Sequence, residues 1–477
     1  MLLVWLVSAC QGAGVQPTPQ TITPTTAVLR PMLTSLPVIT PTATLVPLPP
    51  VDTKTLNGVV VKFWHPWGGE EEQVLRAIVE DFNTHNIWGI HVEASAVGGS
   101  SALFDLLIEN INSGSLPHVV AAPTNQLADQ RIKTVLVDLN PYVADVQWGL
   151  SSQEVAGYAG VIWQQDISEG KRLGVPAQRD VQALFYNRSW ARELGFNTPP
   201  ETPLAFKAQV CAAARQLATD QDAANDGTGG WIVSTDPLVM LSWMLAFGEV
   251  YFPAAEEEDF TFDTPDTRQA YAFLKSMYDD GCAWISRLPQ PYQYFANRQA
   301  LVYSGTLADI APQSRASTAS GSQDEWEVIT YPLQGTQRKP IALTSGLSYA
   351  MLKTDPAEQL ASWLFVRWML LPRHIAGLIE VDGTLPVNHA ALEYLEDYRQ
   401  KYPQWDRAMM LPPLARAAPA TASWRVVRGI VQDSARQIYQ PTLKADQAEM
   451  IPLQLDQMIK EVLQHQTVGQ KTTQQSP

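Results

Sequence analysis

Hydrophobic positions follow a strand-then-helix pattern near the start of the folded part of the chain. Residues 59–64 form a β-branched and aromatic run typical of a strand, and Pro66 with Gly68 and Gly69 ends it. Glutamates follow at 70–72, where a helix N-terminus favours negative charge, and apolar residues then recur at helical spacing up to Phe82. We therefore predict a strand followed by an amphipathic helix.

Further units of the same kind follow along the chain. Residues 90–94 and 118–122 predict strands, whereas residues 103–111 and the segment that opens at Thr124 predict helices. Strands that alternate with helices at this spacing build a parallel α/β sheet. Ligands of such sheets bind at the carboxyl ends of the strands, so we expect residues 64–67, 98–101 and 124–126 along one edge.

The N-terminal residues predict export and anchoring. Residues 1–9 are apolar, too short to span a bilayer, and typical of the apolar region of a signal peptide. The run ends in Val7-Ser8-Ala9-Cys10, which resembles the bacterial lipobox, although the basic residues that usually precede such a run are missing. This resemblance implies that Cys10 carries a lipid. Residues 16–55 are rich in proline and threonine, so the segment 10–56 is expected to be a semi-stiff tether to a membrane surface.

Composition narrows the class of partner. The chain has 477 residues and a formal net charge of -15, with 45% hydrophobic and 17% charged residues, as in an ordinary folded protein. Binding of nucleic acid or of an anionic lipid surface relies on clustered lysine and arginine, so neither is expected as a main partner. The 15 tryptophans call for either a core or a ligand explanation.

Motifs for metal binding and catalysis are weak or absent in the sequence. His65, His85, His91 and His118 lack metal-site spacing, and residues 220–227 resemble a calcium loop only in part, because the pattern fails at Ala224. A turn is the better interpretation of that loop. No nucleophile-elbow, zinc-protease or phosphate-loop motif occurs, so we predict a protein that is not an enzyme and needs no metal or other cofactor. Cys211 and Cys282 are compatible with a disulfide or with two buried thiols.

A family resemblance extends over about residues 57–460. Several short segments resemble, in order and spacing, the extracellular solute-binding proteins of carbohydrate ABC importers, which include the maltodextrin-binding proteins. The segments are 61–70 (VKFWHPWGGE), 174–176 (GVP), 184–189 (LFYNRS), 194–196 (LGF), 199–203 (PPETP), 225–231 (NDGTGGW), 295–305 (FANRQALVYSG), 344–347 (TSGL) and 383–388 (GTLPVN). One departure is that the glycine usual before the alanine of the 295–305 segment is replaced by Arg298-Gln299.

The resemblance implies a periplasmic-binding-protein fold, in which two α/β lobes joined by a hinge close on a ligand. It places hinge crossings near residues 177–183, 301–305 and 345–348. The first lobe is then expected to comprise residues 57–178 and 304–346, and the second lobe residues 182–302 and 348–465, followed by a disordered tail at 466–477. The implied protein is an extracytoplasmic monomer that delivers its ligand to the permease subunits of an ABC transporter.

Sugar chemistry and the predicted strand ends select the candidate site residues. Aromatic rings cover the flat C–H faces of sugars, and polar side chains or close backbone groups pair with their hydroxyls. The candidates are Trp64, Trp67, Gly69, Ser100, Ser101, Thr124, Asn125, Asp180, Trp231, Trp243, Tyr303, Ser304, Ser345 and Gly346.

Two other functional classes stay open at this stage. A tethered glycoside hydrolase needs only two carboxyl groups that are close in space, which no sequence pattern excludes. The same fold could instead hold a non-sugar ligand such as glycerol phosphate, a polyamine or a peptide, although glycerol phosphate calls for a basic cleft in an acidic chain.

Overall fold

A mixed ten-stranded sheet is the central element of the computed structural model, which describes residues 47–253, 260–335 and 339–473. The strand order is β2-β1-β3-β11-β6-β9-β7-β8, with β10 paired to β6 and β12 to β11. These strands are β1 (Val60–His65), β2 (His91–Ala96), β3 (Val119–Pro123), β6 (Val175–Asn187), β7 (Gly229–Ile232), β8 (Ala283–Trp284), β9 (Ala300–Thr306), β10 (Trp326–Ile329), β11 (Ala342–Met351) and β12 (Ala415–Ala417). A separate hairpin joins β4 (Ile167–Ser168) to β5 (Lys171–Arg172).

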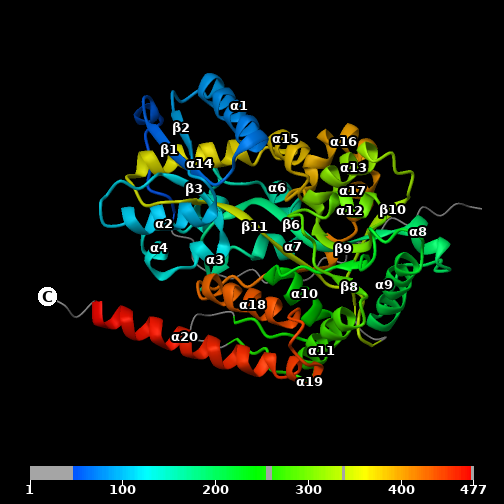
Figure 1. Ribbon diagram of the computed structural model, residues 1–477. Helices are drawn as coiled ribbons and strands as arrows, with labels where there is room; N and C mark the ends of the chain where they lie inside the picture. Colours follow the sequence, from blue (N-terminus) through cyan, green and yellow to red (C-terminus); the bar gives the residue numbers. More distant parts are fainter. Residues whose placement is uncertain (1–46, 254–259, 336–338, 474–477) are drawn as a thin grey trace, which may run out of the picture. The chain divides into compact units, whose positions relative to one another are not determined.

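Helices follow most strands and pack on the sheet (Figure 1). The longer ones are α1 (Gly69–His85), α2 (Ser100–Asn110), α9 (Pro203–Ala218), α10 (Pro237–Phe247), α11 (Pro265–Asp279), α13 (Ile310–Ala319), α14 (Pro356–Met369), α15 (Pro372–Asp382), α18 (Trp424–Ile438) and α20 (Ile451–Thr473). The shorter ones are α3 (Thr124–Leu127), α4 (Gln130–Val135), α5 (Asn140–Ala144), α6 (Ser152–Ala156), α7 (Gly160–Gln164), α8 (Arg188–Glu193), α12 (Tyr292–Ala296), α16 (Glu396–Lys401), α17 (Pro403–Ala408) and α19 (Ala445–Ala448). Four 3-10 helices complete the set: η1 (Thr53–Leu56), η2 (Leu307–Asp309), η3 (His389–Tyr394) and η4 (Pro412–Leu414).

The strand-helix alternation predicted from the sequence is confirmed. The three expected strands appear as β1, β2 and β3, and β1 pairs in parallel with both of the others. The helix predicted after Gly69 is α1, which begins with three glutamates and buries Leu75, Ile78, Val79 and Phe82. None of the helices within the described ranges has the length and apolarity that crossing a membrane requires. Cys10 and most of the expected tether lie outside the described residues.

Two long strands, β6 and β11, connect two groups of strands. The first half-sheet is β2-β1-β3 with residues 347–351 of β11, and the second half-sheet is β9-β7-β8 with β10 and residues 182–187 of β6. Strand β6 pairs with β11 up to Val181 and with β9 from Gln182 onward. One large hydrophobic core includes Phe63 and Phe365 of the first half-sheet and continues to Phe185 and Tyr303 of the second, and a second core includes Trp231 and Trp243.

The contacts assign several segments differently from the expected lobes. Residues 304–306 of β9 and β10 pair with β6 in the second half-sheet, whereas α14 and α15 pack on β1 and α1 of the first. The expected crossing at 301–305 is absent, because β9 pairs only with β6 and β7. The chain changes sides within β6, within β11 and near Leu385, which bridges to Arg179. A strand end and a crossing look alike in sequence, which explains the exchange of these segments.

The structure also describes part of the C-terminal tail and the two cysteines at positions 211 and 282. The tail expected to be disordered from residue 466 instead continues α20 to Thr473. Cys211 of α9 and Cys282 before β8 form a disulfide, with their Cα atoms 4.4 Å apart. Both cysteines are buried in the second core, so the bridge fastens α9 to the edge of that half-sheet.

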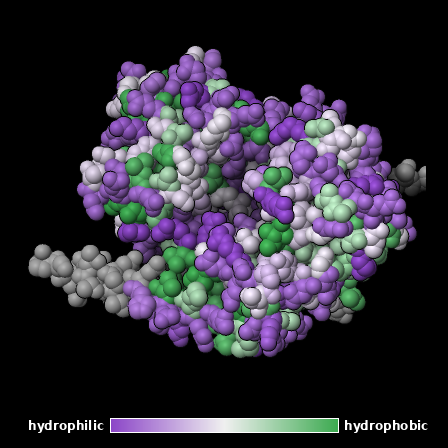
Figure 2. Space-filling model, viewed as in Figure 1, coloured by the Kyte–Doolittle hydropathy of each residue, from purple (hydrophilic) through white to green (hydrophobic). Residues whose placement is uncertain are grey.

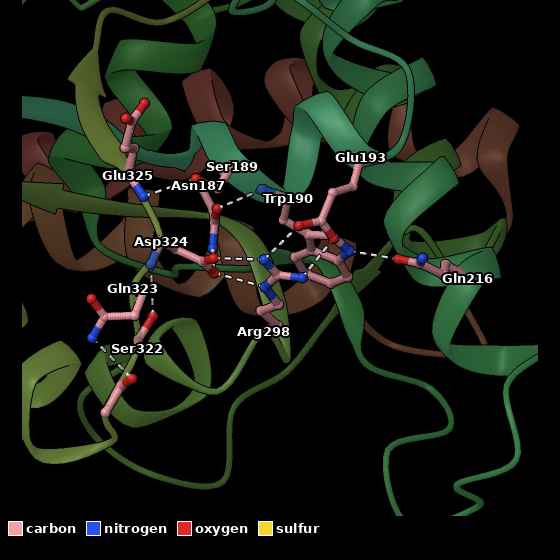
Figure 3. Close-up of polar contacts among 11 residues, drawn as sticks. Asn187, Ser189, Trp190, Glu193, Gln216, Arg298, Ser322, Gln323, Asp324 and Glu325 are labelled. Carbon is pink, nitrogen blue, oxygen red and sulfur yellow. Dashed lines mark hydrogen bonds and ion pairs between the residues drawn. The ribbon is translucent and has the colours of Figure 1, made fainter.

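Arg298 replaces the expected glycine and adopts a left-handed backbone conformation with φ of 56°. Its guanidinium group donates to both carboxylate oxygens of Asp324, at 2.8 and 2.6 Å, and to both of Glu193, at 2.7 and 2.9 Å (Figure 3). Asp324 also accepts from Asn187, whose own Oδ1 caps α8 through the amide of Trp190. These charge-assisted bonds offset the strain of a side chain at positive φ.

Substitutions of Arg298 separate the stabilisation by its side-chain hydrogen bonds from the cost of its left-handed backbone conformation. Arg298→Ala is expected to lower the free energy of unfolding by about 2 kcal/mol, because it removes the bonds to two carboxylates but keeps a Cβ at positive φ. Arg298→Gly is expected to be about 1 kcal/mol less harmful, because glycine adopts this conformation freely. Urea unfolding measures both values, and equal losses in the two variants would contradict the strain argument.

Candidate functional site

Two cavities are bordered by helix α18, and cavity A takes walls from both half-sheets. Cavity A has a volume of about 400 Å³ and is lined from the first half-sheet by Trp67, Glu71, Ser100, Thr124 and Asn125, with Gln178 and 345–347 from the crossing strands. Its other wall consists of Leu238, residues 418–420, Trp424 and Arg428. Cavity B, of about 740 Å³, lies at the carboxyl ends of β7, β8 and β9 in the second half-sheet. Figure 2 shows a hollow near the centre of a mainly hydrophilic face.

Chain topology explains why cavity A forms at this place. Strands β1 and β3 are parallel, so the residues that follow them, Trp67 and Thr124–Asn125, emerge at the same edge. Ser100 begins α2 at the same edge. Gly346 is required where β11 passes β6, because a Cβ at this position would lie 2.0 Å from the carbonyl oxygen of Gln178.

The structure brings many of the sequence-predicted site residues together. Cavity A is lined by Trp67, Ser100, Thr124, Asn125, Ser345 and Gly346, and cavity B by Tyr303 and Ser304. Trp67 is only 5% exposed, packs edge-on against Phe63 and Tyr349, and donates from Nε1 to Gln178 at 3.3 Å. Little of the indole surface is therefore left free for stacking on a ligand. Ligand contact by these residues stays a prediction.

Other predicted residues lie away from both cavities. Trp231 of β7 and Trp243 of the largely apolar helix α10 are both fully buried in the second core, where they pack against Phe206. Trp64 packs against the small core beneath α2 and α4, and Ser101 is exposed on the outer side of α2. Gly69 lines a shallow hollow on the outer face of α1. Asp180 is directed into the protein, where its Oδ1 accepts from the backbone amide of Leu307.

Helix α18 supplies lining residues that sequence reasoning missed. Trp424 and Arg428 line cavity A, and Gln432 and Arg436 line cavity B, so one face with four-residue spacing borders both cavities. The adjacent face buries Val427, Val431 and Ile438 in the second core. The sequence carried this signal as an apolar stripe beside a polar stripe on a single helix.

A fully buried ion pair lies beneath cavity A. Arg179 Nη2 donates to both carboxylate oxygens of Asp166 at 3.1 Å, and both side chains are 0% exposed. Asp166 also accepts from Thr124 Oγ1 at 2.8 Å and from Ser348 Oγ at 2.6 Å, while Arg179 Nε donates to Gln165 at 2.7 Å. Since Thr124 and Gln165 line cavity A, the pair fixes part of its wall.

The side chain of Gln178 contacts two carboxyl groups beside cavity A. Its side-chain amide donates to Asp382 at 2.7 Å and to Glu71 at 3.3 Å. Burial, followed by repulsion from Asp382, raises the pKa of Glu71 to about 7, and burial raises the pKa of Asp382 as well. Burial also raises the pKa of the neighbouring Asp180 to about 7. This part of the site therefore binds protons near neutral pH.

Metal binding has no support in the described residues. No group of three or more histidine, cysteine, aspartate or glutamate side chains within them is placed to hold a metal ion. In the loop at 220–226, Asp220 and Asp222 accept from the backbone amides of Asp222 and Ala224, and Asn225 donates to Asp220. Their oxygens serve the turn itself, as the sequence interpretation favoured.

Breaking the buried ion pair from one side should destabilise the fold strongly. Asp166→Asn is expected to lower the free energy of unfolding by about 3 kcal/mol or more, because it leaves Arg179 charged and buried without a counter-ion. The exposed pair Arg76–Glu72 provides a control, and Arg76→Ala should change stability by roughly 0.5 kcal/mol or less. Urea unfolding measures both, and similar small losses would show that the buried pair is not a structural anchor.

Stability should rise when the pH falls from 8 to 6. A carboxyl group whose folded pKa is raised contributes fully below its unfolded pKa and loses that contribution as the pH rises through the folded value, about 7 for Glu71 and Asp180. Burial lowers the pKa of His65 to about 4, so this histidine partly opposes the trend once the pH falls below its usual pKa of 6.5. Glu71→Gln should therefore stabilise at both pH values, and by roughly 1 kcal/mol more at pH 8 than at pH 6. Thermal unfolding at both pH values checks this, with Glu70→Gln as the exposed control; an equal gain at both pH values would rule out titration of Glu71.

Comparisons with known proteins agree with this architecture. No curated protein sequence is detectably similar to the chain. The solved structure of the sugar-binding protein MalE from Xanthomonas citri is 20% identical with a TM-score of 0.72, covering 88% of this chain and 100% of that one. The cyclic alpha-maltosyl-1,6-maltose binding protein from Arthrobacter globiformis is 18% identical (TM-score 0.68; 84% and 98% covered). UgpB from Mycobacterium tuberculosis, solved in complex with glycerophosphocholine, is 15% identical (TM-score 0.69; 86% and 100% covered).

These likenesses confirm the predicted periplasmic-binding-protein fold. A family model described as bacterial extracellular solute-binding protein matches residues 77–406, which is more than half of the chain. The chain therefore belongs to the family of bacterial extracellular solute-binding proteins.

Proposed function

We propose that this solute-binding protein captures a hydroxylated solute, a sugar or a sugar derivative, in cavity A and delivers it to the permease of its ABC importer. The observation that carries the proposal is the set of uncharged polar side chains on one wall of cavity A. Ser100, Thr124, Asn125, Gln165 and Gln178 all lie there. Hydroxyl and amide groups of this kind pair well with the many hydroxyls of a sugar.

Closure of the two walls on the solute forms part of the proposal. Cavity A takes its walls from both half-sheets, and the chain crosses between them only in β6, in β11 and near Leu385 among the described residues. Few crossings favour a hinge motion, which would bury the solute between the walls. The permease would then bind the closed form and open it.

The neighbouring structures support this class of ligand without fixing it. Two carry sugar-binding names, and one was solved with glycerophosphocholine, which also bears hydroxyl groups. A tethered glycoside hydrolase is not retained, since the family consists of binding proteins and not of enzymes. No feature of cavity A favours a polyamine or a peptide over a hydroxylated solute.

Attachment by a lipid at Cys10 is the accompanying proposal for location. The family is extracellular, and the two other cysteines of the chain are joined to each other. Cys10 is therefore left for another use, and the proline-rich segment after it would hold the binding domain near the permease.

Binding of a panel of solutes tests the proposal directly. Thermal unfolding of the chain from residue 47 onward would be followed with mono- and oligosaccharides, glycerophosphocholine, a polyamine and a peptide. A solute at 100 times its dissociation constant stabilises by about 2.7 kcal/mol, which raises the midpoint by a few degrees. We expect this shift with one class of hydroxylated solute, which is recovered uncut.

A matched pair of serines supplies the site control. Ser100→Ala should weaken binding several-fold, because Ser100 lines cavity A, whereas Ser101→Ala should not, because Ser101 points away. Equal effects of the two changes would place the solute elsewhere. A shift with the polyamine or the peptide alone would contradict the proposed ligand class.

A further inference from the structure

All positive charge on the walls of the two cavities comes from one helix. Arg428 lines cavity A and Arg436 lines cavity B, and no other lysine or arginine among the described residues borders either cavity. The two lie on the same face of α18, roughly 12 Å apart along its axis at 1.5 Å per residue. Helix α18 packs beside α3, whose Thr124 lies on the facing wall (Figure 1).

The acidic side chains on the same walls are already engaged inside the protein. In cavity A the only one among the described residues is Glu71, which accepts from Gln178. In cavity B, Asp236 caps α10 through the amides of Leu238 and Val239. Asp309, also in cavity B, accepts from the amide of Thr306 and from the hydroxyl of Tyr292.

The two arginines are not engaged in the same way. The side chain of Arg428 makes no hydrogen bond or ion pair with another described residue, and Arg428 is exposed. Among the residues that the structure describes, the Arg436 side chain pairs only with Asp433, three residues before it on the same helix, at 2.9 Å. Both members of that pair are more than half exposed, and such pairs contribute little.

Burial of Arg428 would create an unpaired charge unless something neutralises it. Closing cavity A around a solute removes water from its walls, and a guanidinium buried without a partner costs several kcal/mol. Glu71 is a poor counter-ion, because its carboxyl is held by Gln178 and its raised pKa of about 7 leaves it only partly charged at neutral pH. The solute is the remaining source of negative charge.

We infer that the solute carries an anionic group, a phosphate or a carboxylate, and that Arg428 binds this group in cavity A. The inference rests on the proposed function and narrows its ligand class from hydroxylated solutes to anionic ones. The uncharged wall opposite Arg428 would hold the hydroxyls, so the two walls recognise different parts of one molecule. An arginine suits this role, since its planar group pairs with two oxygens of a phosphate or carboxylate at once.

Calorimetric titration with matched neutral and anionic solutes tests the inference. The probes are glucose, glucose 6-phosphate, glucuronate, glycerol, glycerol 3-phosphate and glycerophosphocholine. We expect at least one anionic probe to bind ten-fold or more tightly than its neutral counterpart, with an affinity that falls as salt is added. Phosphate and carboxylate probes distinguish the two sources of charge.

Variants assign the effect to Arg428. Arg428→Gln should weaken the anionic probe ten-fold or more and leave the neutral probe unchanged, and Arg428→Lys should restore part of the affinity. Arg188→Gln removes an exposed arginine from α8, outside both cavities, and should leave binding as it is. Thermal unfolding of each unliganded variant checks that it is folded.

Several outcomes would overturn the inference. If a neutral sugar binds best and Arg428→Gln binds it as tightly as the unchanged protein does, the inference fails while the proposed function stands. If Arg428→Gln and Glu71→Gln weaken neutral and anionic probes alike, Arg428 is a latch to Glu71 in the closed form and not an anion site. If no hydroxylated probe binds, the inference fails together with the proposed function.

Discussion

The buried pair of Asp166 and Arg179 is the interaction on which the site depends. It lies where β6 passes β11, the place at which the two half-sheets share strands. Two buried charges are tolerated there because Asp166 accepts from Thr124 and Ser348 as well, and Arg179 also donates to Gln165 and to backbone carbonyl groups. The network thus fixes wall residues of cavity A with a geometry that apolar packing alone would not specify.

Three consecutive residues of β6 connect this centre to its surroundings. Gln178 reaches Glu71 of α1 and Asp382 of α15, Arg179 reaches Asp166, and Asp180 accepts from Leu307 in η2. The first of these contacts belongs to the first half-sheet and the last to the second. A twist of β6 would therefore displace residues that it contacts in both half-sheets. We therefore expect this strand to transmit the proposed closing motion.

Much of the fold was predictable, because strands and helices of the first half-sheet follow clear periodicities around Val61, Phe63 and Phe82. The order of family-like segments also indicated the architecture. The lobe division was not predictable, since only pairing in space shows that β9 returns to β6 and that α14 packs on β1. The chemistry of tryptophan predicts ligand contact at Trp231 and Trp243, whereas the packing of β7 and α10 buries both in the second core. The sequence did not indicate Arg428, because the residues that face it across cavity A are far from it along the chain.

The disulfide between Cys211 and Cys282 constrains the order in which export, oxidation and packing of the second core take place. Its sulfur atoms join residues 71 positions apart, inside a core that leaves each cysteine almost fully covered. An oxidant cannot reach the thiols once that core has formed, so they must meet while the chain between them is still loose. Disulfides persist outside the reducing cytosol. Translocation therefore precedes the final packing of the second half-sheet, and oxidation becomes a step of maturation and not a later modification of a finished protein.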